Sequence, residues 1–138
     1  MNKEEIRAFK NELKNVNFYR NKINELKIEI EIIEYDLMGV KGVNFTPHQS
    51  TTNPISKSSY YYAQLDKKDK LIKKKKAYDD KLNSINQLLD SIDDGKTKQM
   101  IIDIYIEGKG FLSTAIKFNY SNHGVQQRID SALKKIEL

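Results

Sequence analysis

The sequence predicts an all-α protein in which a long antiparallel helical hairpin, a coiled-coil-like arm, precedes a C-terminal helix-turn-helix. Three observations predict this architecture. Narrow apolar stripes with a seven-residue repeat run through two long segments. A segment with glycine and proline separates those two segments. The last third of the chain carries shorter helical patterns joined by Gly and Asn.

The first predicted helix runs from Lys3 to Met38. Its apolar side chains recur every seven residues, at Phe9, Val16, Ile23, Ile30 and Leu37. No Gly or Pro lies within it. A single uninterrupted helix of about 50 Å is therefore expected, at ~1.5 Å per residue.

A loop is expected from Gly39 to Ser58, because two glycines and two prolines end the periodicity there. The second long helix is expected from Ser59 to Ile92. Its seam holds apolar residues every seven positions, except that Lys75 stands where Leu would be expected. Since neither helix could bury its stripe alone, we expect an antiparallel hairpin over residues 1–92 that assembles further into a homodimer or higher homo-oligomer.

Composition favours a small protein without a deep substrate pocket. Charged residues make up 31 % of the 138 residues, and there is no cysteine, which excludes disulfides and thiolate metal sites. His48 and His123 lie far apart in the sequence, and no catalytic constellation is found. We expect a cytoplasmic protein that is not an enzyme, needs no cofactor or metal, and does not enter the membrane.

The net charge of +5 is a modest bias toward polyanions such as nucleic acids. Between residues 66 and 81, eight lysines stand against four aspartates, whereas residues 93–138 hold seven bases and six acids. The run from Lys73 to Lys76 is interpreted as a solvated helix face. The run from Tyr60 to Tyr62 is interpreted as packing or a dimer contact.

Residues 93–138 are predicted to form the second domain. Asp93, Asp94 and Gly95 end or bend the long helix before three shorter ones. The three are expected at Thr97–Glu107, with Met100, Ile101, Ile104 and Tyr105 as its apolar side, at Leu112–Phe118, and at Asn122–Ile136. Gly108 suits a left-handed cap after the first of these three helices.

The last two helices have what a helix-turn-helix needs. Ala115 allows the two helices to cross closely, Asn119 tolerates the left-handed conformation of a tight turn, and Ser121 is a good N-cap. An apolar inner face is expected for the last helix, at Val125, Ile129, Ala132 and Ile136.

The opposite face of the last helix is the predicted DNA reader. Glutamine, asparagine and lysine side chains can reach base edges in the major groove, and basic side chains beside them suit phosphates. The predicted base-reading positions on this face are His123, Gln127, Asp130 and Lys134. Gln126 flanks them, and Asn122 begins the inserted segment. The predicted phosphate contacts are Arg128, Lys117 and Lys135.

Three short segments resemble a known family. They are Tyr105-Ile106-Glu107-Gly108, Tyr120-Ser121 and Ala132-Leu133-Lys134-Lys135-Ile136. Together they resemble the sigma-region-4-type helix-turn-helix of small phage-encoded transcriptional regulators of the ArpU/RinA kind. Thr114 stands where that pattern has Ile, which leaves Ile116 exposed, and Asn119 replaces the usual Gly. The resemblance implies late-gene control through promoter DNA and RNA polymerase.

The sequence thus predicts a homodimeric, phage-type transcriptional regulator that reads double-stranded DNA with residues 122–134. Two alternatives stay open. One is a protein-interaction module with a vestigial helix-turn-helix, which the acid Asp130 and the weak basic charge of residues 93–138 favour. The other is a small terminase-like packaging protein, which also combines a helix-turn-helix with a helical oligomerisation arm.

Overall fold

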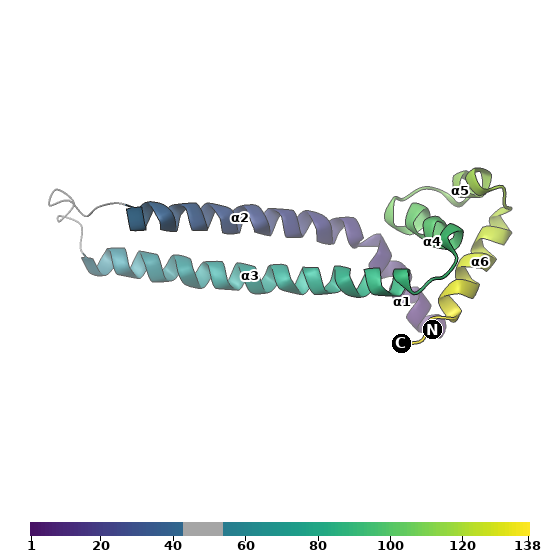
Figure 1. Cartoon of the computed structure of the whole chain (residues 1–138), viewed down its shortest axis with the longest axis horizontal. Coiled ribbons are helices and arrows are strands. Elements are labelled where there is room, and N and C mark those ends of the chain that lie inside the picture. The colour runs from purple at the N-terminus through teal and green to yellow at the C-terminus, as the bar shows by residue number, and fades with distance from the viewer. Residues whose placement is uncertain (43–53) are drawn as a thin grey trace. The chain divides into compact units, whose positions relative to one another are not determined.

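The computed structural model describes residues 1–42 and 54–138, with the backbone alone described at 40–42 and 54–57. The described part consists of helices and turns without strands, which confirms the all-α class. In order, its elements are α1 (Lys3–Lys14), α2 (Val16–Gly42), α3 (Pro54–Asp90), α4 (Gly95–Ile101), the π-helix η2 (Ile102–Ile106), α5 (Phe111–Phe118) and α6 (Asn122–Lys134) (Figure 1).

The expectation of one uninterrupted N-terminal helix was wrong, because the helix stops at Asn15. The Asn15 N–H bonds to the carbonyl of Glu12, three residues back, and α2 starts afresh at Val16. Leu13 and Val16, on either side of the break, are both buried. Tertiary packing therefore sets this boundary, and no Gly or Pro marks it in the sequence.

The expected loop from Gly39 to Ser58 was too long. Of this range, residues 39–42 and 54–58 are helical, and residues 43–53 lie outside the described part. A lone glycine costs a helix only about 1 kcal/mol, so α2 passes through Gly39. Pro54 begins α3 because proline suits the first position of a helix, where its missing N–H is not needed.

The chain divides into two compact units, which we call the terminal unit (Met1–Tyr19 with Asp80–Leu138) and the central unit (Arg20–Asp79). These limits differ from the predicted domains 1–92 and 93–138. In the terminal unit, α1 packs against η2 and α6, so the first helix shares a core with the C-terminal helices. The physical reason is that α1 presents a buried apolar face, formed by Ile6, Phe9 and Leu13.

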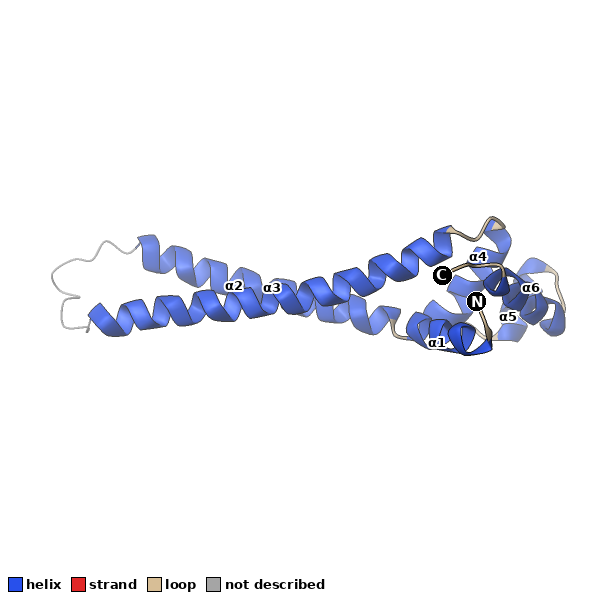
Figure 2. Cartoon of the chain, turned by 90° about the horizontal axis from the view of Figure 1, so that it is seen from below, coloured by secondary structure: helices blue, strands red, loops and turns tan. Residues whose placement is uncertain are grey.

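The central unit consists of the greater part of α2 and α3. The two helices lie side by side and run in opposite directions (Figures 1 and 2). The stripe of α2 that faces α3 is buried, at Leu26, Ile30, Ile33 and Leu37. Between the helices, the Lys68 ammonium lies 3.2 Å from a Glu34 carboxylate oxygen. Lys75, the expected exception in the seam, is half-buried and pairs with Asp79 of its own helix at 3.0 Å.

The expected helix from Thr97 to Glu107 is instead α4 followed by η2. In η2 the N–H of Glu107 bonds to the carbonyl of Ile102, five residues back. This wider turn shifts the buried face, so Ile106 is buried and Tyr105, expected on the apolar side, is only half-buried. Gly108 then adopts a positive φ of 72°, as expected of a left-handed cap.

Candidate nucleic-acid interface

The turn between α5 and α6 has the predicted local geometry. Asn119 is left-handed at φ 60°, and the next N–H, of Tyr120, donates to the carbonyl of Ala115 at 2.9 Å. Ser121 caps α6, because its hydroxyl oxygen accepts a hydrogen bond from the Gly124 N–H at 3.0 Å. Two short helices are therefore joined through only three residues, and Ala115 is buried where α5 packs against α6.

The inner face of α6 is fully buried at Val125, Ile129 and Leu133. Ala132, expected on this face, is only half-buried, and Leu133 takes its place. Because α6 packs against α1 as well as against α4 and α5, its buried face turns toward the side that carries Leu133. Ile136, past the end of the helix, is also buried.

The outer face of α6 holds most of the predicted base-reading side chains. Six of the nine predicted contact residues are exposed and make no side-chain hydrogen bond or ion pair with any described residue: Asn122, His123, Gln126, Gln127, Lys134 and Lys135. The helix therefore presents amide, imidazole and ammonium groups to solvent opposite a fully buried apolar face.

The other three predicted residues are engaged within the protein. Arg128 donates to Asp94 at 3.1 Å and lies 4.4 Å from the centre of the Tyr120 ring. Asp130 accepts from Lys10 of α1 at 2.9 Å. Its negative charge on the reading face is therefore offset by an ammonium group.

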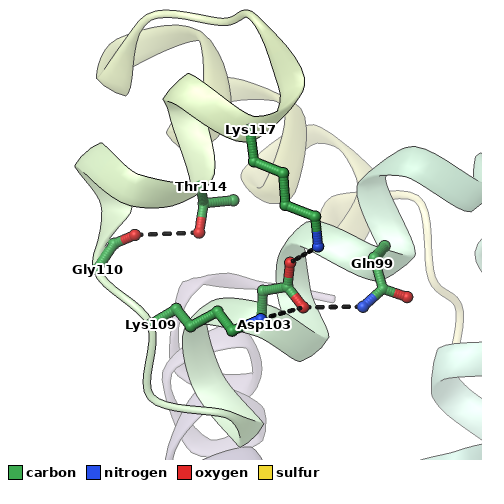
Figure 3. Close-up of polar contacts among 6 residues, drawn as sticks. All are labelled: Gln99, Asp103, Lys109, Gly110, Thr114 and Lys117. Carbon is green, nitrogen blue, oxygen red and sulfur yellow. Dashed lines mark hydrogen bonds and ion pairs between the residues drawn. The ribbon is translucent and has the colours of Figure 1, made fainter.

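Lys117, a predicted phosphate contact, points to a carboxylate inside the protein (Figure 3). The Asp103 side chain is 2 % exposed and accepts hydrogen bonds from Lys117 at 2.9 Å and from Gln99 at 2.8 Å. The Lys109 ammonium is 3.9 Å away. Asp103 thereby ties α5 to η2 and α4, and we call these four residues the Asp103 cluster.

The cluster stabilises the charged form of Asp103. Burial by itself raises the pKa of this carboxyl. The hydrogen bonds from Lys117 and Gln99 and the positive charges of Lys109 and Lys117 outweigh burial and hold the pKa below its usual value. Asp103 is therefore an anion in the core of the terminal unit, neutralised by two lysines that are each half-exposed.

A second polar cluster precedes α4. Asp94 is the N-cap, and its carboxylate accepts hydrogen bonds from the Thr97 hydroxyl at 2.6 Å and from the Lys96 N–H at 3.1 Å. The Thr97 hydrogen bond is the main cause of a lowered Asp94 pKa, to which the Arg128 charge adds. Arg128 thus joins α6 to the start of α4.

Sequence reasoning missed these anchoring acids. Asp94 was interpreted only as a helix end, although Asp before a helical pattern is a strong N-cap signal. Asp103 lies between Ile102 and Ile104 in an otherwise apolar segment, which is the one signal that could have drawn attention to it.

A groove of about 1130 Å³ in the terminal unit runs along one side of α6. One wall carries Ile92, Asp93 and Asp94, and the α6 wall includes Gln127 and Lys134. Acidic and basic side chains both line the groove. No cluster of three His, Asp or Glu side chains suited to a metal ion occurs among the described residues.

None of the described helices is long and apolar enough to cross a membrane. Comparison with family models, curated proteins and solved structures finds no match to this chain.

Proposed function

We propose that this protein is a homodimeric, sequence-specific DNA-binding transcriptional regulator that reads the major groove with α6. The observation that carries the proposal is the division of α6 into two faces. Val125, Ile129 and Leu133 are fully buried, whereas His123 and Gln127 are exposed and their side chains pair with no residue that the structure describes. A helix that is anchored on one side and polar on the other is the arrangement with which helix-turn-helix proteins read a major groove.

The turn before α6 supports the same function. Its left-handed Asn119 and its Ser121 cap bring two short helices together as helix-turn-helix proteins do. The resemblance to ArpU/RinA-like phage regulators supports a role in late-gene control, with RNA polymerase as a second partner. A homodimer would prefer two half-sites separated by about one helical turn of DNA or a multiple of it.

The internal partners of Lys117 and Arg128 change which side chains we expect to contact bases and which we expect to contact phosphates. Gln126 and Gln127 are the best candidates for base contacts, because glutamine pairs well with adenine. Lys135 stays available for a phosphate, and we add Lys134, which was predicted for base edges, as a second phosphate contact. Lys117 and Arg128 would have to give up an internal partner first. We therefore expect few phosphate contacts and a modest dependence of affinity on salt.

The test starts with selection from a random duplex DNA library, followed by anisotropy titration of the selected site with the full chain. Gln127→Ala should lower the affinity for the selected site about 5- to 150-fold. Losing one contact between a side chain and a base costs ~1–3 kcal/mol. Lys134→Ala should lower the slope of log affinity against log salt by about 1.

Gln87→Ala is the matched control, because Gln87 is an exposed helical glutamine of α3 in the same unit. This control should bind as the wild type does. If the library yields no enriched sequence, or if Gln127→Ala binds the selected site as tightly as Gln87→Ala, direct reading by α6 is excluded.

One observation favours a second candidate, a protein-interaction module. Leu112 and Ile116, four residues apart on α5, are 64 % and 69 % exposed, which is unusual for large apolar side chains. Exposed apolar pairs of this kind suit a protein partner better than a phosphate backbone. If Leu112→Ser and Ile116→Ser abolish regulation in cells while DNA affinity stays unchanged, α5 contacts a protein.

A further inference from the structure

The central unit carries a second apolar stripe on α2, outside its packed seam. Ile28, Ile32 and Tyr35 are 56 %, 56 % and 78 % exposed. They are four and three residues apart, so they share one face of the helix. The seam residues Leu26, Ile30, Ile33 and Leu37 are buried on another face. We call Ile28, Ile32 and Tyr35 the outer stripe.

The outer stripe is rimmed by negative charge. Residues 28–38 contain four acids and no base. Glu34 forms an ion pair with Lys68. The side chains of Glu29, Glu31 and Asp36 are exposed and make no hydrogen bond or ion pair with any described residue. An occupant of this face must therefore be both apolar and basic.

The same unit displays a surface of that chemistry on α3. Residues 67–76 hold seven lysines and one aspartate. Lys73, Lys74 and Lys76 are exposed and unpaired with any described residue, and Ile72 beside them is 43 % exposed. Lysine stems also cover apolar surface while their ammonium groups stay in water.

We propose that the central unit is a self-association surface, on which the outer stripe of α2 packs against the lysine-rich residues 67–76 of α3 in a second copy. Pairing α2 with α2 would bring two acidic rims together, which is unfavourable. Pairing α2 with α3 places opposite charges together and shields Ile28, Ile32 and Tyr35 from water. The inference rests on the homodimer of the proposed function but not on DNA binding.

Two charge-reversed variants of the full chain test this pairing by sedimentation equilibrium without DNA. The first, the α2 variant, carries Glu29→Lys, Glu31→Lys and Asp36→Lys. The second, the α3 variant, carries Lys73→Glu, Lys74→Glu and Lys76→Glu. The wild type should associate, and each variant alone should not, because like charges then meet. An equimolar mixture should associate again, because every contact joins opposite charges once more.

The α3 variant distinguishes the two geometries. If α2 paired with α2, the α3 variant would keep both acidic rims and would associate like the wild type. Association of the α3 variant alone would therefore overturn the proposal. The proposal would also be overturned by a wild type that stays monomeric over about a hundredfold range of concentration. Such a range favours association by ~2.7 kcal/mol. Because no DNA is present, these failures are distinct from a failure of base reading by Gln127.

Charge reversal could separate α2 from α3 within one copy of the chain, so two single substitutions provide a second test. Ile32→Ser should weaken association at least about tenfold, a loss of ~1.4 kcal/mol, with helicity by circular dichroism unchanged. Leu138→Ser, at a similarly exposed apolar position of the terminal unit, should leave association unchanged. Equal association of both variants would exclude the outer stripe.

Discussion

Asp103 shows how one buried charge holds the C-terminal helices in place. Its carboxylate accepts hydrogen bonds from Lys117 of α5 and Gln99 of α4 (Figure 3). Asp103 therefore fixes the position of α5, which directly precedes the turn into α6. Buried carboxylates of this kind destabilise a protein when their partners are removed, because the remaining group stays without compensation. Asp103 is therefore a structural anchor of the candidate interface.

We expect Asp103→Asn to lower the free energy of unfolding by about 1–3 kcal/mol, since the charged hydrogen bond with Lys117 is lost in the core. Urea denaturation measures it. Asp66→Asn is the control, because Asp66 pairs with Lys70 on the exposed surface of α3 and such pairs contribute ~0.5 kcal/mol. An equal loss in both variants would contradict the anchoring role.

The lowered pKa of Asp103 also predicts an acid dependence. A depressed carboxyl pKa stabilises the fold above the pKa of the unfolded chain, near 4, and this contribution disappears as the pH falls through the folded value. The stability difference between the wild type and Asp103→Asn should therefore be full at about pH 6 and shrink below about pH 4. Urea titrations at several pH values measure it, and a constant difference would contradict the assignment.

At the scale of the element, the turn between α5 and α6 depends on one left-handed residue. Asn119 has φ 60° and ψ 42°, a conformation that costs most L-residues roughly 1–2 kcal/mol. Asn119→Ala should lower the free energy of unfolding by about 1 kcal/mol, whereas Asn119→Gly should preserve or raise it. Thermal denaturation compares the two, and equal melting temperatures would show that the turn relaxes.

Gly124 lies in the first turn of α6, where the Ser121 cap leaves little room for a larger residue. A Cβ added at Gly124 would lie 3.1 Å from the Ser121 hydroxyl oxygen, which is the capping acceptor. The usual gain of ~1 kcal/mol from replacing a helical glycine by alanine is thus opposed by crowding of the cap. Gly124 weakens the helix by propensity and protects its N-cap by its size.

At the scale of the whole molecule, α1 belongs with the C-terminal helices. Leu13 of α1 is completely buried in the terminal unit. Leu13→Ala should destabilise that unit by roughly 2–5 kcal/mol through a cavity, and amide hydrogens of α6 should then exchange faster. Hydrogen exchange followed by mass spectrometry measures this effect.

The matched control is Leu26→Ala, the same change at a buried position of the central unit. It should speed exchange in α2 and α3 more than in α6. If Leu13→Ala leaves α6 protected, the C-terminal helices form a core without α1, as the predicted domain 93–138 requires.

The repeating apolar pattern was sufficient to predict the all-α class and approximate helix positions. Asn119, Ser121 and Gly108 could be assigned from local chemistry, because φ preference and capping depend on a few neighbouring residues. The break at Asn15 and the π-turn at Ile102–Ile106 could not, because packing between distant segments sets them. For the same reason Leu133, and not Ala132, fills the core.

The sequence by itself determined the helical class, the left-handed turn and the cap of α6, because each depends on short-range periodicity or on one residue's own conformational preference. Tertiary structure alone decided which charges are free. From the sequence, Lys117, Arg128 and Asp130 looked as free to contact DNA as Gln127 and Lys134 did. Only the packing of α1, η2 and the start of α4 showed that the first three have partners.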